Sequence, residues 1–89
     1  MTEAKKIEIY TTDYCPFCKR AKELLNTKGV VYTEINVEAE SERQKMVQRT
    51  GGPRSVPQIF VDGELLAGGC DGLYERDSKG ELDLILGLK

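Results

Sequence analysis

The stretch KKIEIYTTDYCPFCKRAKELLNTK (residues 5–28) changes its hydrophobic period partway along, and this change decides the fold class. Alternating isoleucines predict a strand over residues 5–10. Apolar side chains then recur at helical spacing until Gly29, which predicts a helix over residues 15–28. A β-branched run predicts a second strand over residues 30–37, so these three elements form a parallel βαβ unit with a right-handed crossover.

The rest of the chain adds a helix, two strands and a helix. We expect these elements at residues 38–49, 58–61, 64–67 and 70–77, followed by a terminal helical segment at residues 82–88. Asp62 and Gly63 separate the two strands and predict a type I′ hairpin turn, which needs positive φ at both central residues. The order β-α-β-α-β-β-α predicts an α/β fold, with a four-stranded mixed sheet flanked by helices, as a single domain over residues 1–89.

The composition excludes several classes of function. With 13 basic and 15 acidic residues the net charge is −2, which supplies no field able to hold nucleic acid or an anionic membrane. No stretch is apolar enough for a signal peptide or a membrane span, so we expect a cytoplasmic protein. The three cysteines, an odd number, argue against a disulfide framework and for a redox, metal-binding or incidental role.

Cys15-Pro16-Phe17-Cys18 places two of these cysteines where a strand passes into a helix. A thiol at the first turn of a helix faces free N–H groups and the positive end of the dipole, which favours the thiolate, so Cys15 is predicted as the nucleophile. Cys18 follows one turn later, close enough to form a disulfide with Cys15, which predicts a resolving role.

Two alternatives for the cysteine pair stay open. One is half of a zinc site, for which the chain offers no histidine and no second Cys-x-x-Cys, and the other is a plain pair of core cysteines.

Two further motifs accompany the cysteine pair: Ser55-Val56-Pro57 before the hairpin, and Gly68-Gly69-Cys70-Asp71 at the start of the third predicted helix. With these motifs in this order, the chain resembles a glutaredoxin of the dithiol class and short bacterial type. The resemblance implies a thioredoxin fold, glutathione as cosubstrate and no metal. It also implies a set of residues that bind glutathione around Cys15: Thr12, Tyr14, Phe17, Arg43, Ser55, Val56, Pro57, Gly69, Cys70 and Asp71.

The resemblance implies particular roles for several of these residues. Pro57 would be cis and would turn the backbone of Val56 toward the cysteinyl part of glutathione. The N–H groups of Cys70 and Asp71 would bind the γ-glutamyl carboxylate, and the Asp71 side chain would attract the ammonium group. Plainer alternatives are a strand-initiating Pro57 and an Asp71 that only caps its helix. Phe17 could instead belong to the core, and the Cys70 thiol could be incidental or regulatory.

Some positions depart from the family pattern. Thr12 stands where the family often has a lysine. Arg43, together with Arg54, would therefore contribute more to binding the glycyl carboxylate. The alternative is that Arg43 is simply solvated. Ser55 replaces the usual threonine, and Gly72 replaces a frequent aspartate.

These features together predict a glutathione-dependent thiol-disulfide oxidoreductase. Cys15 would attack glutathionylated proteins and small mixed disulfides, and Cys18 would take part in reducing protein disulfides. We expect a monomer that binds neither nucleic acid nor membrane. Two other functions stay open: a thioredoxin-like hydrogen donor, against which the Gly68–Asp71 motif argues, and a carrier of an iron-sulfur cluster held by Cys15 and glutathione from two subunits.

Overall fold

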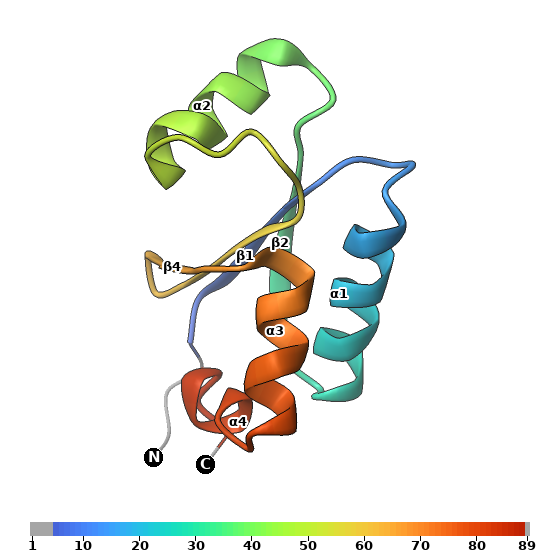
Figure 1. Cartoon of the computed structure of the whole chain (residues 1–89), viewed down its shortest axis with the longest axis vertical. Helices are drawn as coiled ribbons and strands as arrows, with labels where there is room; N and C mark the ends of the chain where they lie inside the picture. The colour runs from blue at the N-terminus through green and yellow to red at the C-terminus, as the bar shows by residue number, and fades with distance from the viewer. Residues whose placement is uncertain (1–4, 89) are drawn as a thin grey trace.

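The computed structural model describes residues 5–88, which form four strands and four helices (Figure 1). Along the chain these elements are β1 (Ile7–Thr11), α1 (Pro16–Thr27), β2 (Tyr32–Asn36), α2 (Glu40–Thr50), β3 (Gln58–Val61), β4 (Glu64–Leu66), α3 (Gly69–Ser78) and α4 (Leu82–Ile85). The order is the predicted one, with the terminal helical segment shortened to the single turn α4. The boundaries shift by a residue or two; β2 starts later than expected because the Val30 N–H bonds to the Leu25 carbonyl at the end of α1 (3.4 Å). None of the helices within residues 5–88 has the length and apolarity needed to cross a membrane.

The four strands form one mixed sheet in the order β2-β1-β3-β4. β1 runs parallel to β2 and antiparallel to β3, and β3 and β4 pair as a hairpin. The hairpin turn has positive φ at both Asp62 (51°) and Gly63 (83°), as a type I′ turn requires. This topology confirms the expected fold class. It also places the last residues of β1 beside the first residues of β3, because Tyr10 pairs with Gln58.

Helices cover both faces of the sheet. Alternate side chains of β1 and β3 point to opposite faces, so each of these strands contributes to two cores. The larger core lies under α1, α3 and α4, and its most buried members include Ile9, Ala21, Leu25, Ile59, Leu73 and Leu82. The smaller core lies under α2 and consists of Tyr10, Val37, Met46 and Phe60. In Figure 1, α1 and α3 lie side by side, while α2 sits apart from them at the far end of the molecule.

A single buried apolar residue, Met46, anchors α2 on the sheet, as expected for a mostly solvated helix. Arg49 adds polar contacts, because its guanidinium donates hydrogen bonds to both carboxylate oxygens of Glu8 (3.0 and 2.8 Å) and to the Tyr10 hydroxyl (3.1 Å). The same guanidinium lies 4.0 Å from the centre of the Phe60 ring. The hydrogen bonds from Arg49 hold the pKa of Glu8 below its usual range. An ion pair therefore joins α2 to the central strand.

We expect Arg49→Met to lower the free energy of unfolding at neutral pH by about 1–2 kcal/mol, because it removes a well-aligned ion pair and a stacked cation. The pKa of Glu8 is lower in the folded protein, so its contribution is present at neutral pH and is lost as the pH falls through the folded pKa. The difference from the unsubstituted protein should therefore narrow below about pH 4. Urea unfolding at several pH values measures both effects.

Lys45→Met is the matched control, because Lys45 lies on the same helix and its one ion pair within the described part of the chain is with Glu42 at the surface. Its effect should stay within about 0.5 kcal/mol. Equal destabilisation by the two substitutions, or a difference that does not narrow in acid, would show that the ion pair with Glu8 does not anchor α2.

Candidate active site

Cys15 is the N-cap of α1 and follows β1 after a short turn. Pro16 occupies the first helical position, where its missing N–H costs nothing. The Cys15 sulfur accepts a hydrogen bond from the Cys18 backbone N–H (3.3 Å), so it sits directly at the positive end of the helix. The thiol in turn points to the Val56 carbonyl, with 3.8 Å between sulfur and oxygen. The first predicted motif thus meets the second in space.

The two thiols of the motif have different environments. Cys18 is 1% exposed and packs inside the first turn of α1, whereas Cys15 is only partly buried. Burial, and after it the neighbouring Cys15 sulfur, raises the pKa of Cys18 to about 12. Cys18 therefore stays protonated at neutral pH, while Cys15 offers an accessible sulfur at a helix N-terminus.

The segment before β3 forms the next part of the site. The Val56–Pro57 peptide bond is cis, as the resemblance implied. Gln58 folds this segment back on itself, because its side-chain amide donates to the Ser55 carbonyl (2.8 Å) and to the Ser55 hydroxyl (3.3 Å). The Gln58 amide thus fixes the start of the segment at Ser55. The pairing of β3 with β1 fixes its end at Gln58.

The third part of the site is the turn that leads into α3. Gly68 is the N-cap with φ of +96°, and Gly69 follows with φ of +58°. A side chain on Gly69 would begin only 3.0 Å from the Pro57 carbonyl oxygen, so glycine lets the turn approach the cis-proline segment closely. The first N–H groups of α3 have no acceptor inside the helix, and they lie at this turn.

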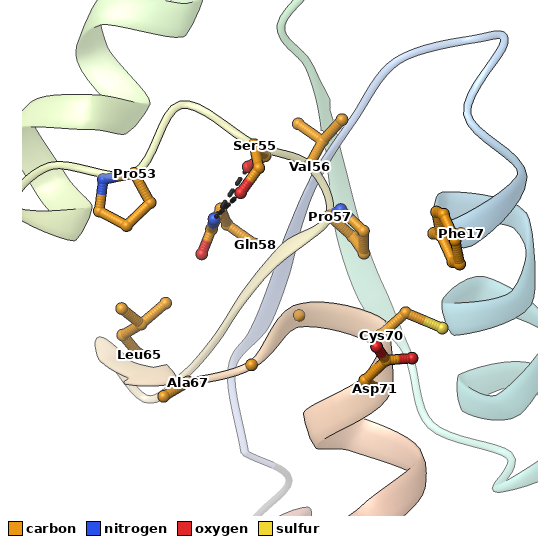
Figure 2. A pocket seen from close by; sticks show the side chains of 12 residues that line it. Phe17, Pro53, Ser55, Val56, Pro57, Gln58, Leu65, Ala67, Cys70 and Asp71 are labelled. Atoms are coloured by element: carbon orange, nitrogen blue, oxygen red, sulfur yellow. Dashed lines mark hydrogen bonds between the residues drawn. The ribbon is translucent and has the colours of Figure 1, made fainter.

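A cavity of about 350 Å³ lies between these parts (Figure 2). It is lined by Phe17, Pro53, Ser55, Val56, Pro57, Gln58, Leu65, Ala67, Gly68, Gly69, Cys70 and Asp71. Figure 2 shows the Phe17 ring on α1 across from Pro57, and the Cys70 side chain pointing toward α1. The cavity therefore runs from the neighbourhood of the cysteine motif to the start of α3.

Most of the residues predicted to surround Cys15 meet at this cavity. Its lining includes seven of them: Phe17, Ser55, Val56, Pro57, Gly69, Cys70 and Asp71. Phe17 is 50% exposed, which contradicts the alternative of a core phenylalanine. Cys70 is buried, and burial raises the pKa of its thiol.

Three predicted residues lie away from the cavity lining. Thr12 is 3% exposed, and its carbonyl accepts the Cys15 N–H (3.4 Å), so it holds the Cys15 backbone. Tyr14 is 77% exposed beside Cys15. Arg43 lies on α2, and its Nε is buried with no hydrogen-bond partner among residues 5–88. Arg54 is engaged elsewhere, because its guanidinium binds both carboxylate oxygens of Glu40 (2.6 and 2.8 Å).

The predicted binding residues leave out five lining residues, Pro53, Gln58, Leu65, Ala67 and Gly68, of which Gly68 belongs to the third motif. The predicted hairpin could have indicated Gln58 and Leu65 as lining residues. It pairs Phe60 with Leu65 and places both strands beside the cis-proline segment. Pro53 and Ala67 belong to irregular segments, whose path follows from no local pattern. Within residues 5–88, no three or more His, Cys, Asp or Glu side chains are grouped so as to hold a metal ion.

An accessible cysteine at a helix N-cap, a protonated thiol one turn later and a cis-proline facing them on a thioredoxin-like fold define a thiol-disulfide oxidoreductase. Comparisons with known proteins narrow this class. The family model for glutaredoxin matches residues 7–66. A probable glutaredoxin of Synechocystis sp. is 47% identical over 87 residues, which cover 97% of this chain and 98% of the relative.

Solved structures agree with this assignment. The solution structure of glutaredoxin from Brucella melitensis matches with a TM-score of 0.80 and 38% identity, covering 96% of this chain and 91% of that one. The crystal structure of a buckwheat glutaredoxin-glutathione complex matches with a TM-score of 0.79 and 31% identity, covering 92% and 76%. The chain belongs to the glutaredoxin family.

We expect iodoacetamide to modify Cys15 in the folded, reduced protein at least about tenfold faster than either other cysteine, because only Cys15 combines exposure with a helix N-terminal position. The raised pKa values of Cys18 and Cys70 and their burial protect them. Time-resolved mass spectrometry of the modified peptides gives the three rates.

The same reaction in concentrated urea is the control, and all three cysteines should then react at similar rates. Modification of Cys18 or Cys70 in the folded protein as fast as that of Cys15 would contradict the assignment of Cys15 as the accessible thiol.

Proposed function

We propose that this glutaredoxin reduces mixed disulfides between glutathione and proteins or small thiols, and also protein disulfides, with Cys15 as nucleophile and Cys18 as resolving thiol. The observation that carries this proposal is the 3.8 Å approach of the Cys15 sulfur to the Val56 carbonyl, beside a cavity that leads to the N-terminus of α3. A sulfur bound next to Cys15 could thus belong to a ligand that extends into the cavity.

The cavity suits the γ-glutamyl half of glutathione. Its volume of about 350 Å³ lies within the range of small-molecule sites. The backbone of Val56, whose carbonyl lies 3.8 Å from the Cys15 sulfur, would pair with the cysteinyl residue of the ligand as an added strand does. The N–H groups of Cys70 and Asp71 at the start of α3 suit the γ-glutamyl carboxylate, and the exposed Asp71 carboxylate suits the ammonium group. The related buckwheat glutaredoxin was crystallised as a glutathione complex, which supports this choice of ligand.

The glycyl half would extend the other way, toward Tyr14 and α2. Arg43 is the candidate partner for the glycyl carboxylate, because its Nε lacks a partner among the described residues whereas Arg54 already binds Glu40. Thr12 would contribute by holding the Cys15 backbone. Tyr14 and Phe17 would form apolar walls on either side of the reacting sulfur.

In the proposed reaction the Cys15 thiolate attacks the glutathione sulfur of a mixed disulfide, and the target leaves as a thiolate that takes up a proton. Cys15 is then joined to glutathione. A second glutathione thiolate attacks the glutathione sulfur of this adduct, which yields glutathione disulfide and restores the Cys15 thiolate. With a protein disulfide, Cys15 first forms a mixed disulfide with the target. Cys18 then loses its proton and attacks Cys15, releasing the reduced target and leaving a Cys15–Cys18 disulfide, which two glutathione molecules reduce.

We further propose that residues 1–89 act as a single monomeric domain in the cytoplasm. Its partners would be glutathione and glutathionylated or disulfide-bearing proteins, and neither nucleic acid nor a membrane has a role. Coupled assays with purified protein and separate measurement of its mass in solution test these points.

We expect Cys18→Ser to retain reduction of a glutathione mixed disulfide within about threefold, while reduction of a protein disulfide falls at least about a hundredfold, because only the second reaction needs a resolving thiol. Cys15→Ser should abolish both activities. Turnover is followed with glutathione and glutathione reductase.

Cys70→Ser is the control for loss of a thiol outside the motif, since in the proposed reaction Cys70 contributes its backbone N–H and not its sulfur, and both activities should stay within about twofold. Loss of both activities in Cys18→Ser, or residual mixed-disulfide reduction in Cys15→Ser, would overturn the assignment of roles.

A further inference from the structure

The turn that leads into α3 is held tightly from two sides. On the side of the cavity, a side chain on Gly69 would begin 3.0 Å from the Pro57 carbonyl oxygen. On the opposite side, a side chain on Gly68 would begin 2.9 Å from the Gly72 Cα. The segment at Gly68 and Gly69 therefore packs tightly between the cis-proline segment and the first turn of α3. A small displacement of this segment would move the N–H groups of Cys70 and Asp71, which line the cavity.

Arg76 binds this turn from the side away from the cavity. Its Nη1 donates hydrogen bonds to the Ala67 carbonyl (2.9 Å) and to the Gly72 carbonyl (3.0 Å), so it connects the turn to the helix that the turn begins. Its hydrogen bonds are thus directed to backbone carbonyls, and it lies outside the cavity lining.

Gly72 makes room for this arrangement. A side chain at Gly72 would collide with the Ala67 carbonyl oxygen and would begin 2.8 Å from the Arg76 Nη1. The guanidinium and the turn therefore occupy the space that any larger residue at position 72 would need. Gly72 and Arg76 act as a matched pair that lets the turn pack onto α3.

We propose that Arg76 is a positioning residue for γ-glutamyl recognition: by tying Ala67 to Gly72, it sets the orientation of the Cys70 and Asp71 N–H groups toward the ligand carboxylate. This inference rests on the proposed function, because it assigns these N–H groups to glutathione. Arg76 itself does not touch the ligand. Its loss should therefore affect ligands that carry the γ-glutamyl group and spare ligands that lack it.

The test compares two mixed disulfides of 2-mercaptoethanol, one with glutathione and one with cysteinylglycine, the dipeptide that lacks the γ-glutamyl group. It uses the full chain with Cys18→Ser, in which the adduct on Cys15 accumulates, and follows each adduct by quenched-flow mass spectrometry. The measured quantity is the selectivity, the second-order rate constant with the glutathione disulfide divided by that with the cysteinylglycine disulfide. Arg76→Met should lower this selectivity about tenfold, the effect of losing one to two net hydrogen bonds, and leave the cysteinylglycine rate within about twofold.

Lys79→Met is the matched control, because it removes the same charge from the C-cap of α3 and, among residues 5–88, Lys79 forms an ion pair only with Glu75 at the surface. Its selectivity should equal that of the parent. Arg76→Lys keeps the charge and can still donate to the carbonyls, so it should recover most of the selectivity. If Arg76→Met fails to fold, Arg76→Gln replaces it. Glutamine is too short to bind both carbonyls, so the selectivity of Arg76→Gln should be lower than that of the parent, by less than the fall expected for Arg76→Met.

Two results would overturn the inference and leave the proposed function intact. One is unchanged selectivity in Arg76→Met, or in Arg76→Gln where that variant replaces it. The other is an equal fall of both rates, which would show a general structural role. A parent that does not prefer the glutathione disulfide would refute γ-glutamyl recognition itself, and the role of Arg76 with it. These cases are distinguishable because the last is read from the parent alone.

Discussion

The antiparallel pairing of β1 with β3 is the constraint on which the site depends. Their register runs from Ile7 opposite Val61 to Tyr10 opposite Gln58, so the end of one strand meets the start of the other. The Cys15 thiol thereby reaches the Val56 carbonyl although 41 positions separate the two residues in the chain. A slip of this register by one residue would turn the strand side chains to the opposite faces and break both cores, so the sheet holds the sulfur beside the cis-proline segment with little freedom.

The same helix start gives two chemically different thiols. Cys15, as the N-cap, projects from the end of α1 and meets backbone N–H groups. Cys18, three residues later, is 1% exposed, and burial raises its pKa to about 12. One sulfur can therefore react with a disulfide in solvent, and the other can react only when a partner sulfur is already bound next to it. The proposed roles of Cys15 as nucleophile and Cys18 as resolving thiol follow from this difference in burial.

The two ends of the proposed ligand site are built differently. At the start of α3 the backbone is packed so closely that glycines are required, and Arg76 ties the turn to the helix. Toward α2, one buried methionine and the Arg49 contacts hold the helix, and the positive groups are side chains. Backbone donors held by tight packing lose little freedom on binding, whereas long side chains must be ordered. The γ-glutamyl end is accordingly the better preorganised of the two.

Hydrophobic period, turn residues and the placement of Cys15-Pro16-Phe17-Cys18 were sufficient to predict the elements, their order and the position of Cys15 at the start of a helix, because each is a local property of the chain. The three motifs also predicted most of the cavity lining, since each marks the end of an element that the sheet brings to the same edge. Only the tertiary structure decided that Thr12 is buried and its carbonyl accepts the Cys15 N–H, that Pro53 and Ala67 line the cavity, and that Arg54 is bound to Glu40. The physical reason is that the direction of a side chain depends on how strands pair and how helices pack on the sheet, and these arise from contacts between residues far apart in the chain.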